Sequence, residues 1–165
     1  MSDFGPTDQR LRRVKARMPD FAVDAMRLVR MTNHLQKTFR DRTNALLKKF
    51  DLADSSYTVL AILYGSVDET ASASELSETC HEKPANLTRV CDELVARGLI
   101  VRRPKPGDRR AVMISLCDAG RELVEQVIPE VSNMVGEATA GFTADELRQL
   151  SSLYARLLAS LNGRP

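Results

Sequence analysis

Apolar residues recur along most of the chain at the spacing of helices. Over residues 21–50 they follow one another at intervals of three and four, which predicts one long helix. Asp54 is expected to cap a second helix. Ser72 and Glu75 have the spacing of a capping box and predict the start of a short third helix.

A fourth helix is predicted between Pro84, which suits a first turn, and Gly98, which suits a helix end. Its apolar face follows the i, i+3, i+4, i+7, i+8 pattern. The residues on this face are Leu87, Val90, Cys91, Leu94 and Val95.

After Gly98 the period of the pattern changes. A short β-type run covers residues 99–103, and Val112, Ile114 and Leu116 alternate with their neighbours. The stiff segment 104–108 lies between them. The pattern therefore predicts a β-hairpin.

Helical spacing resumes after Asp118, and Pro129 is expected to bend this helix or to break one of its hydrogen bonds. Gly141 should end it, and Thr143 with Glu146 forms a second capping box. Asp118 itself is expected to cap the helix that follows the hairpin.

The last helix has apolar residues at intervals of 3, 4, 3 and 4, the seam of a helix packed on another helix. They are Leu147, Leu150, Tyr154, Leu157 and Leu161. The seam could belong to the core of one chain. A homodimer is favoured, because a small lobe offers little surface to cover long helices at both ends.

Three helices followed by a β-hairpin are the order of a winged helix-turn-helix. The prediction is a mainly α fold with a small β-hairpin. It has an N-terminal arm and dimerisation helix at 1–50, a DNA-binding lobe at 51–117 and C-terminal dimerisation helices at 118–165. Residues 1–19 are interpreted as a short arm helix, with a disordered tail as the alternative.

The composition agrees with a folded domain. The chain has 165 residues, of which 43% are hydrophobic and 28% charged, enough to bury a core. No apolar run reaches the ~20 residues of a membrane span, and the N-terminus lacks an apolar signal segment. Three cysteines without a CxxC pair favour a reducing cytoplasm over a disulfide framework.

The net charge of +2 conceals a strong internal asymmetry. Residues 83–110 carry eight basic and three acidic residues, whereas 68–82 carry five acidic and no basic ones. Residues 118–165 carry four basic and seven acidic residues. A basic stretch between acidic ones concentrates positive potential locally, although a solvated face without a partner is the simpler alternative.

In the fourth helix, the first two turns place polar side chains away from the apolar face. Recognition helices contact base edges through such N-terminal residues. Asn and Arg have fork geometries suited to adenine and guanine edges, and Lys and Thr can reach phosphates. The candidate DNA-binding residues here are Lys83, Asn86, Thr88 and Arg89.

The hairpin loop and its flanks are also basic. An Arg at a stiff hairpin tip suits insertion into a minor groove, and a neighbouring carboxylate can hold a second Arg in place. The candidates here are Arg103, Lys105, Asp108, Arg109 and Arg110, with Arg102 counted in the same basic group.

These residues carry a specific resemblance. Between residues 86 and 120 the chain has Asn-Leu-Thr-Arg, four residues, Leu-Val, two residues, Gly-Leu-Ile, seven residues and Asp-Arg-Arg. This pattern resembles the signature of the MarR family (multiple antibiotic resistance regulators), and the helical order over residues 20–161 fits it. The resemblance implies a homodimeric winged-helix transcription factor, usually a repressor, that binds a pseudo-palindrome. It also implies that helices at both ends of the chain form the dimer.

The resemblance also implies roles for individual residues. Asp108 and Arg110 would brace the wing, and Arg109 would enter the minor groove. The four candidates on the fourth helix would face the major groove. The chain departs from the family pattern at Cys117, where Thr or Ser is usual, and at Val95, where an acidic residue is frequent.

Many members of the family respond to small aromatic acids bound between the dimer helices and the DNA-binding lobe. Arg30 and His34 lie four residues apart on one helix face, and a cation beside an imidazole could hold a carboxylate. Tyr57 could add a hydroxyl. The alternative places Arg30 and His34 on the solvent side or in a dimer interface.

Other classes of function find less support in the sequence. A redox-responsive repressor would need an exposed thiol of lowered pKa, and Cys80 and Cys91 are expected inward. Metal-ligand spacing, phosphate loops and nucleophile motifs are lacking, so neither a cofactor nor an enzyme is expected. A winged helix that only contacts proteins remains an alternative, which salt-dependent duplex binding would distinguish.

Overall fold

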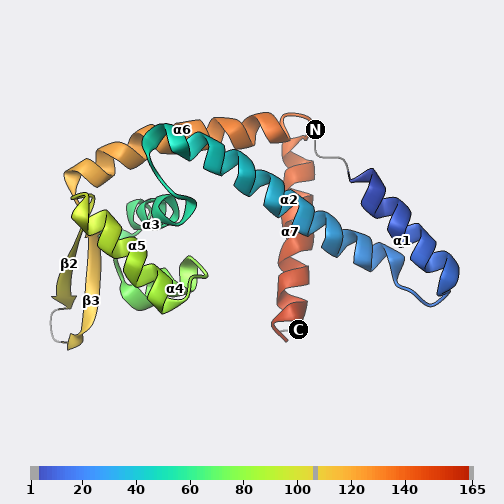
Figure 1. The fold of residues 1–165 in the computed structure, drawn as a ribbon, viewed down its shortest axis with the longest axis horizontal. Helices are drawn as coiled ribbons and strands as arrows, with labels where there is room; N and C mark the ends of the chain where they lie inside the picture. The colour runs from blue at the N-terminus through green and yellow to red at the C-terminus, as the bar shows by residue number, and fades with distance from the viewer. Residues whose placement is uncertain (1–3, 106–107, 164–165) are drawn as a thin grey trace. The chain divides into compact units, whose positions relative to one another are not determined.

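A computed structural model describes residues 4–105 and 108–163, with the side chains of Lys105 and of 108–111 outside the described part. The fold is mainly helical with a small antiparallel sheet, as predicted (Figure 1). In chain order the elements are α1 (Gly5–Arg17), α2 (Val23–Leu47), η1 (Lys48–Phe50), α3 (Asp54–Tyr64), η2 (Val67–Glu69), β1 (Thr70–Ser72), α4 (Ala73–Thr79), α5 (Pro84–Ala96), β2 (Ile100–Lys105), β3 (Asp108–Leu116), α6 (Asp118–Thr139) and α7 (Ala144–Leu161). Among the described residues, no helix is long and apolar enough to cross a membrane.

The chain forms two compact units, Met1–Val127 and Ile128–Pro165, which are described separately. In the first, the sheet has the order β1-β3-β2 and is antiparallel throughout. The predicted hairpin is present, with Ile100 opposite Leu116. Strand β1 was not predicted, because three residues are too few to show an alternating pattern.

The core of the lobe lies between α3, α4, α5 and the sheet. Leu60, Leu63, Leu76 and Leu94 are completely buried, and Ile114 of β3 is nearly so. The apolar face predicted for α5 is buried at four positions, whereas Val95 is exposed. Burial of this face orients α5, so its opposite face is left for solvent or a partner.

The N-terminal helices confirm the predicted long helix and favour the arm helix over a tail. Helix α2 ends at Leu47 and continues as the short η1. Helix α1 packs on α2 through buried Leu11, and Asp8 accepts a hydrogen bond from Arg27 at 2.6 Å. The Arg27 hydrogen bond lowers the pKa of the Asp8 carboxyl. Helix α2 still exposes several large apolar side chains, namely Met26, Leu28, Val29, Met31 and Leu35.

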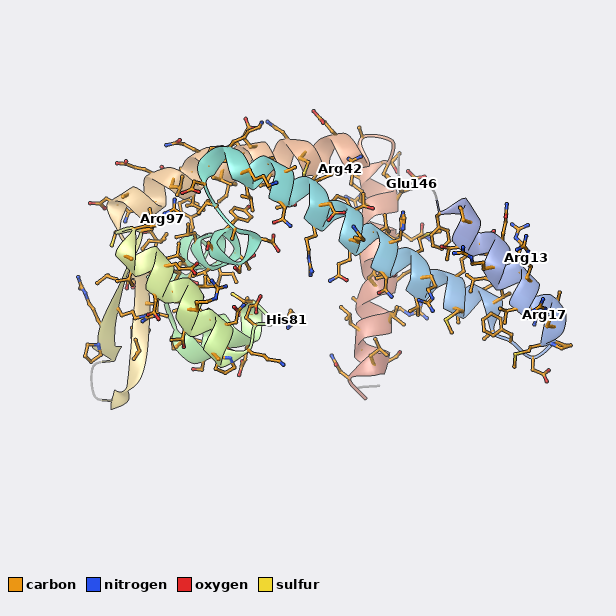
Figure 2. The ribbon with its side chains drawn as sticks, viewed as in Figure 1. Arg13, Arg17, Arg42, His81, Arg97 and Glu146 are labelled. Carbon is orange, nitrogen blue, oxygen red and sulfur yellow. The ribbon has the colours of Figure 1, made fainter. Side chains whose placement is uncertain are left out.

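The second unit contains the end of α6 and all of α7. Thr143 and Glu146 form the predicted capping box at the start of α7 (Figure 2). Helix α6 runs through Pro129, which has no amide hydrogen to donate within the helix. The exposed leucines of α7 are Leu150, Leu153, Leu158 and Leu161.

Two predicted helix caps are wrong. Asp54 is the first residue of α3, and the preceding Ala53 occupies the cap position with extended backbone. Asp118 is likewise the first residue of α6, and the Cys117 carbonyl accepts from the Arg121 amide. In both cases the acidic residue lies in the first turn, where its charge still favours the positive end of the helix.

Candidate nucleic-acid interface

Helix α5 presents a polar face because its other face is committed to the core. Its backbone starts at Pro84, after Lys83 in extended conformation at the cap position. The turn before it contains His81 in left-handed backbone conformation, with φ of 51° (Figure 2). At the other end, Arg97 donates to the Asp51 carbonyl at 2.7 Å and ties the helix to η1. The C-terminal end of the helix is therefore fastened to the neighbouring η1.

The four predicted recognition residues share the face of α5 that the core leaves free. Lys83, Thr88 and Arg89 are exposed, and Asn86 is half-buried. The Thr88 hydroxyl donates to the Pro84 carbonyl at 2.9 Å, which satisfies a backbone acceptor of the first turn. The structure brings Asn86 and Arg89 into contact, whereas the contacts of all four side chains with DNA stay a prediction.

A row of hydrogen bonds connects two of these residues to carboxylates. The Asn86 Nδ2 donates to Glu82 Oε2 at 2.7 Å, and Arg89 Nη2 donates to Asn86 Oδ1 at 3.0 Å. Arg89 Nη1 also donates to the Glu93 carboxylate. Sequence spacing indicates that positions 82, 86, 89 and 93 share a face, but the prediction considered only the basic and amide members.

The wing is formed by β2 and β3, with a register shift between Pro104 and Lys105. Arg103 is exposed, as predicted for a DNA contact. The side chains of Lys105, Asp108, Arg109 and Arg110 lie outside the described residues, so their roles stay predictions.

Arg102 has a different role from the other basic residues of the wing. It donates to the Asp92 carboxylate and to the Thr88 carbonyl, the latter at 3.0 Å, so it fastens β2 to the recognition helix. The inward position of Arg102 could have been predicted from the alternation of side chains along the strand. Arg102 is two residues from buried Ile100 and therefore faces inward, whereas Arg103 faces outward.

Two of the three candidate ligand-binding residues lie in one groove. Arg30 and His34 of α2, with Arg10 of α1, line a cavity of about 630 Å³ whose apolar walls include Leu11 and Phe21. Tyr57 of α3 is not among the residues that line it, so the structure does not bring the three candidates together there. Burial raises the pKa of the Tyr57 hydroxyl.

A second cavity lies within the lobe, between α4, α5 and the sheet. Its volume is about 560 Å³. The lining is largely apolar and includes Leu87, Val112 and Ile114. Its polar residues are Ser74, Ser77, Glu78, Thr88 and Arg102. Sequence reasoning missed this cavity because its lining comes from four separate elements, α4, α5, β2 and β3.

Two of the three cysteines, Cys80 and Cys91, do not have the environment of reactive thiols. Cys91 is buried, and burial raises its pKa. Burial also raises the pKa of the half-buried Cys80, to about 11. A thiolate sensor requires a lowered pKa, so neither residue supports the redox alternative. Among the described residues, no group of three potential metal ligands is found.

The fold and the exposed face of α5 beside a wing define a DNA-binding protein of the winged-helix class. The MarR family model matches residues 50–111. The multiple antibiotic resistance protein MarR of Escherichia coli is 32% identical over 80% of this chain and 89% of its own. The transcriptional repressor MprA of E. coli is 29% identical over 98% of this chain and 92% of its own.

Solved structures agree. A mutant of E. coli MarR complexed with operator DNA superimposes with a TM-score of 0.73 and 26% identity, over 84% of this chain and 99% of that one. NadR in complex with 4-hydroxyphenylacetate has the same fold, with a TM-score of 0.68 and 20% identity over 84% of this chain and 94% of that one. The chain belongs to the MarR family. It is a DNA-binding transcription regulator and not an enzyme.

Proposed function

We propose that the protein is a homodimeric repressor that binds a pseudo-palindromic operator in the cytoplasm and is released by a small aromatic acid. The observation that carries the proposal is the exposed polar face of α5, with Lys83, Thr88 and Arg89 next to the wing. The relatives MarR and MprA support the regulatory role.

The exposed apolar side chains at both ends of the chain support the dimer. On α2, Val29 is 51% exposed, and on α7 Leu158 is 59% and Leu161 75% exposed. Several large apolar side chains exposed on one helix often mark a protein interface. Two-fold symmetry would then place two recognition helices in successive major grooves, about one helical turn apart.

The first experiment selects duplexes from a random pool and measures their affinity at several salt concentrations. We expect a selected sequence with two-fold symmetry and an affinity that falls steeply with salt. If the protein binds no duplex even at low salt, the protein-interaction alternative replaces the proposal. Arg109→Ala tests the wing and should cost roughly 1–3 kcal/mol of binding free energy; an unchanged operator affinity would remove Arg109 from the minor groove.

The groove at Arg30 and His34 supports an aromatic-acid effector, since it combines cations with apolar walls. The aromatic acid bound to NadR illustrates the chemistry that this fold can accommodate. The effector would change the separation of the two lobes and lower DNA affinity without direct competition. Salicylate titration of the operator complex tests this: Arg30→Ala should require more salicylate, and equal release of both proteins would contradict the role of Arg30.

The cavity of the lobe is a second candidate for the same effector, because its largely apolar lining includes Arg102, although Glu78 lines it as well. Ala73 lines the cavity, so Ala73→Leu should fill it without changing any charge. Loss of the salicylate response in Ala73→Leu but not in Arg30→Ala assigns the effector to the lobe. The opposite result assigns it to the groove, and peroxide serves as the comparison for the redox alternative.

A further inference from the structure

The polar face of α5 includes carboxylates that compete with DNA for the side chains of Asn86 and Arg89. Glu82, Asn86, Arg89 and Glu93 form one continuous hydrogen-bonded row, in which each end is a carboxylate. Both amide atoms of Asn86 take part in this row: the nitrogen donates one of its two hydrogens to Glu82, and the oxygen accepts from Arg89. These are the two atoms that an Asn would use to read an adenine edge. In the free protein, Asn86 therefore serves as a support for the Arg89 guanidinium.

The carboxylates also affect how Arg89 responds to a phosphate. Arg89 and Glu93 are 59% and 51% exposed, so their ion pair adds little to folding stability. The pair nevertheless compensates the charge of Arg89 on the surface that meets DNA. Either ligand must replace Glu93 at the guanidinium, but a phosphate carries a negative charge that both carboxylates repel, whereas a guanine edge offers two acceptors without a net charge.

We propose that Glu82 and Glu93 are specificity-determining residues, which hold Asn86 and Arg89 in an internal row that a guanine edge displaces more readily than a phosphate does. The carboxylates then weaken binding to arbitrary DNA more than binding to the operator, a form of discrimination by repulsion. This inference rests on the proposed reading of DNA by α5. In this inference Asn86 positions Arg89, and Arg89 reads the base.

The test compares Glu93→Gln and Glu82→Gln with the wild type on two duplexes. One is the selected operator, and the other is a shuffled duplex of equal length and composition. Glu93→Gln should bind the shuffled duplex about ten times more tightly and the operator less than about three times more tightly, so specificity falls. Glu82→Gln should shift both in the same direction by less, because Glu82 contacts Arg89 only through Asn86.

Salt dependence provides a second readout that a purely structural role would not change. In Glu93→Gln, Arg89 becomes free to neutralise a phosphate of the shuffled duplex. The slope of log affinity against log salt for that duplex should steepen by about one, while the operator slope stays the same.

The control is Glu122→Gln, which removes one exposed negative charge from α6. We expect a small and equal change on both duplexes, as for a general charge effect. If Glu93→Gln also changes both duplexes equally, the inference is overturned. If the wild type shows no preference for the operator over the shuffled duplex, the proposed function itself fails.

The role of Asn86 is tested by a double-mutant cycle. If Asn86 only positions Arg89, Asn86→Ala adds little to the loss caused by Arg89→Ala, and both variants relax preference at the same base pair. Additive losses at two different base pairs would show that Asn86 reads a base itself and would contradict this assignment.

Discussion

Two arginines of this protein pair with carboxylates in opposite ways. On α5, Arg89 pairs with Glu93 four residues away, and both side chains are more than half exposed. On α6, Arg121 pairs with Glu69, which is 52 residues away, and the two side chains are 39% and 25% exposed. The first pair can exchange its partner for DNA, whereas the second joins distant parts of the lobe.

The hydrogen bonds of Arg121 fasten α6 to the segment that precedes β1. Its Nε donates to both carboxylate oxygens of Glu69, at 2.8 and 3.0 Å, and its Nη2 donates at 2.6 Å. A further hydrogen bond from Nη1 reaches Asp118 at 2.8 Å. The hydrogen bonds that Arg121 donates to Glu69 lower the pKa of the Glu69 carboxyl and raise the pKa of Arg121.

The backbone at Glu69, the partner of Arg121, has an unusual conformation. Glu69 has a φ of 50°, which only few non-glycine residues adopt, and it directly precedes β1. We infer from the comparison that the same pair of groups suits recognition of DNA where both are exposed and near in sequence. It serves architecture where strands and helices bring them together from afar.

The largest expected effect comes from Gly120, next to Arg121. A Cβ at Gly120 would lie 2.1 Å from the Leu99 carbonyl oxygen, so Gly120→Ala forces the backbone of α6 away from the lobe. We expect a loss of about 3 kcal/mol in the free energy of unfolding, the upper end for overpacking. Chemical denaturation measures it. Gly136→Ala on the same helix, where a Cβ meets nothing within 4 Å, should instead be neutral or stabilising.

The next effect concerns binding alone. Arg89→Ala should weaken operator binding by roughly 1–3 kcal/mol and relax the preference at one base pair. The midpoint of thermal unfolding should stay the same, because the lost ion pair is exposed. A clear drop in that midpoint would show that Arg89 is a structural residue like Arg121.

For Arg121→Met we expect the opposite result, namely a loss of stability with little effect on DNA binding. It leaves Glu69 without its partner at a half-buried site, so thermal stability should fall, by less than in Gly120→Ala. Duplex contacts of α5 should persist at temperatures where the variant is folded. An unchanged unfolding midpoint, measured by circular dichroism, would contradict this structural role of Arg121.

The smallest effect is a dependence on pH. Because the pKa of Glu69 is lowered in the folded protein, its contribution to stability is complete above the pKa of the unfolded chain, about 4.3. The contribution is lost as the pH falls through the lower folded value. Thermal unfolding between pH 7 and pH 3 should therefore show a smaller acid-induced loss in Glu69→Gln than in the wild type. Equal losses would mean that other carboxyls determine the acid response.

The sequence predicted those parts of the protein whose signals are local. Both capping boxes are present, at Ser72 and Thr143, because a cap involves residues only three apart. The buried face of α5 followed from its periodicity for the same reason. The two predicted caps at Asp54 and Asp118 failed by one residue, since an acidic residue suits both the cap and the first turn.

Contacts between distant segments were not predictable in this way. The pair of Glu69 and Arg121 depends on the unpredicted strand β1, which has no periodic pattern of its own. Arg102 was grouped with the DNA-binding residues because its charge was counted and its side of the strand was not. For the candidate site, the sequence indicated the exposed face of α5. It did not indicate that Glu82 and Glu93 accept hydrogen bonds from Asn86 and Arg89 on that face.

Ser72 belongs to two elements at once. It ends β1, paired with Met113 of β3, and it caps α4 by accepting from the Glu75 amide. No linker residue therefore separates β1 from α4. The position of β1 in the sheet fixes which side chains of α4 face the core. A single inserted residue after Ser72 would turn α4 by about 100° and carry Leu76 out of the core. The chain thus tolerates substitution at this point better than any change in length.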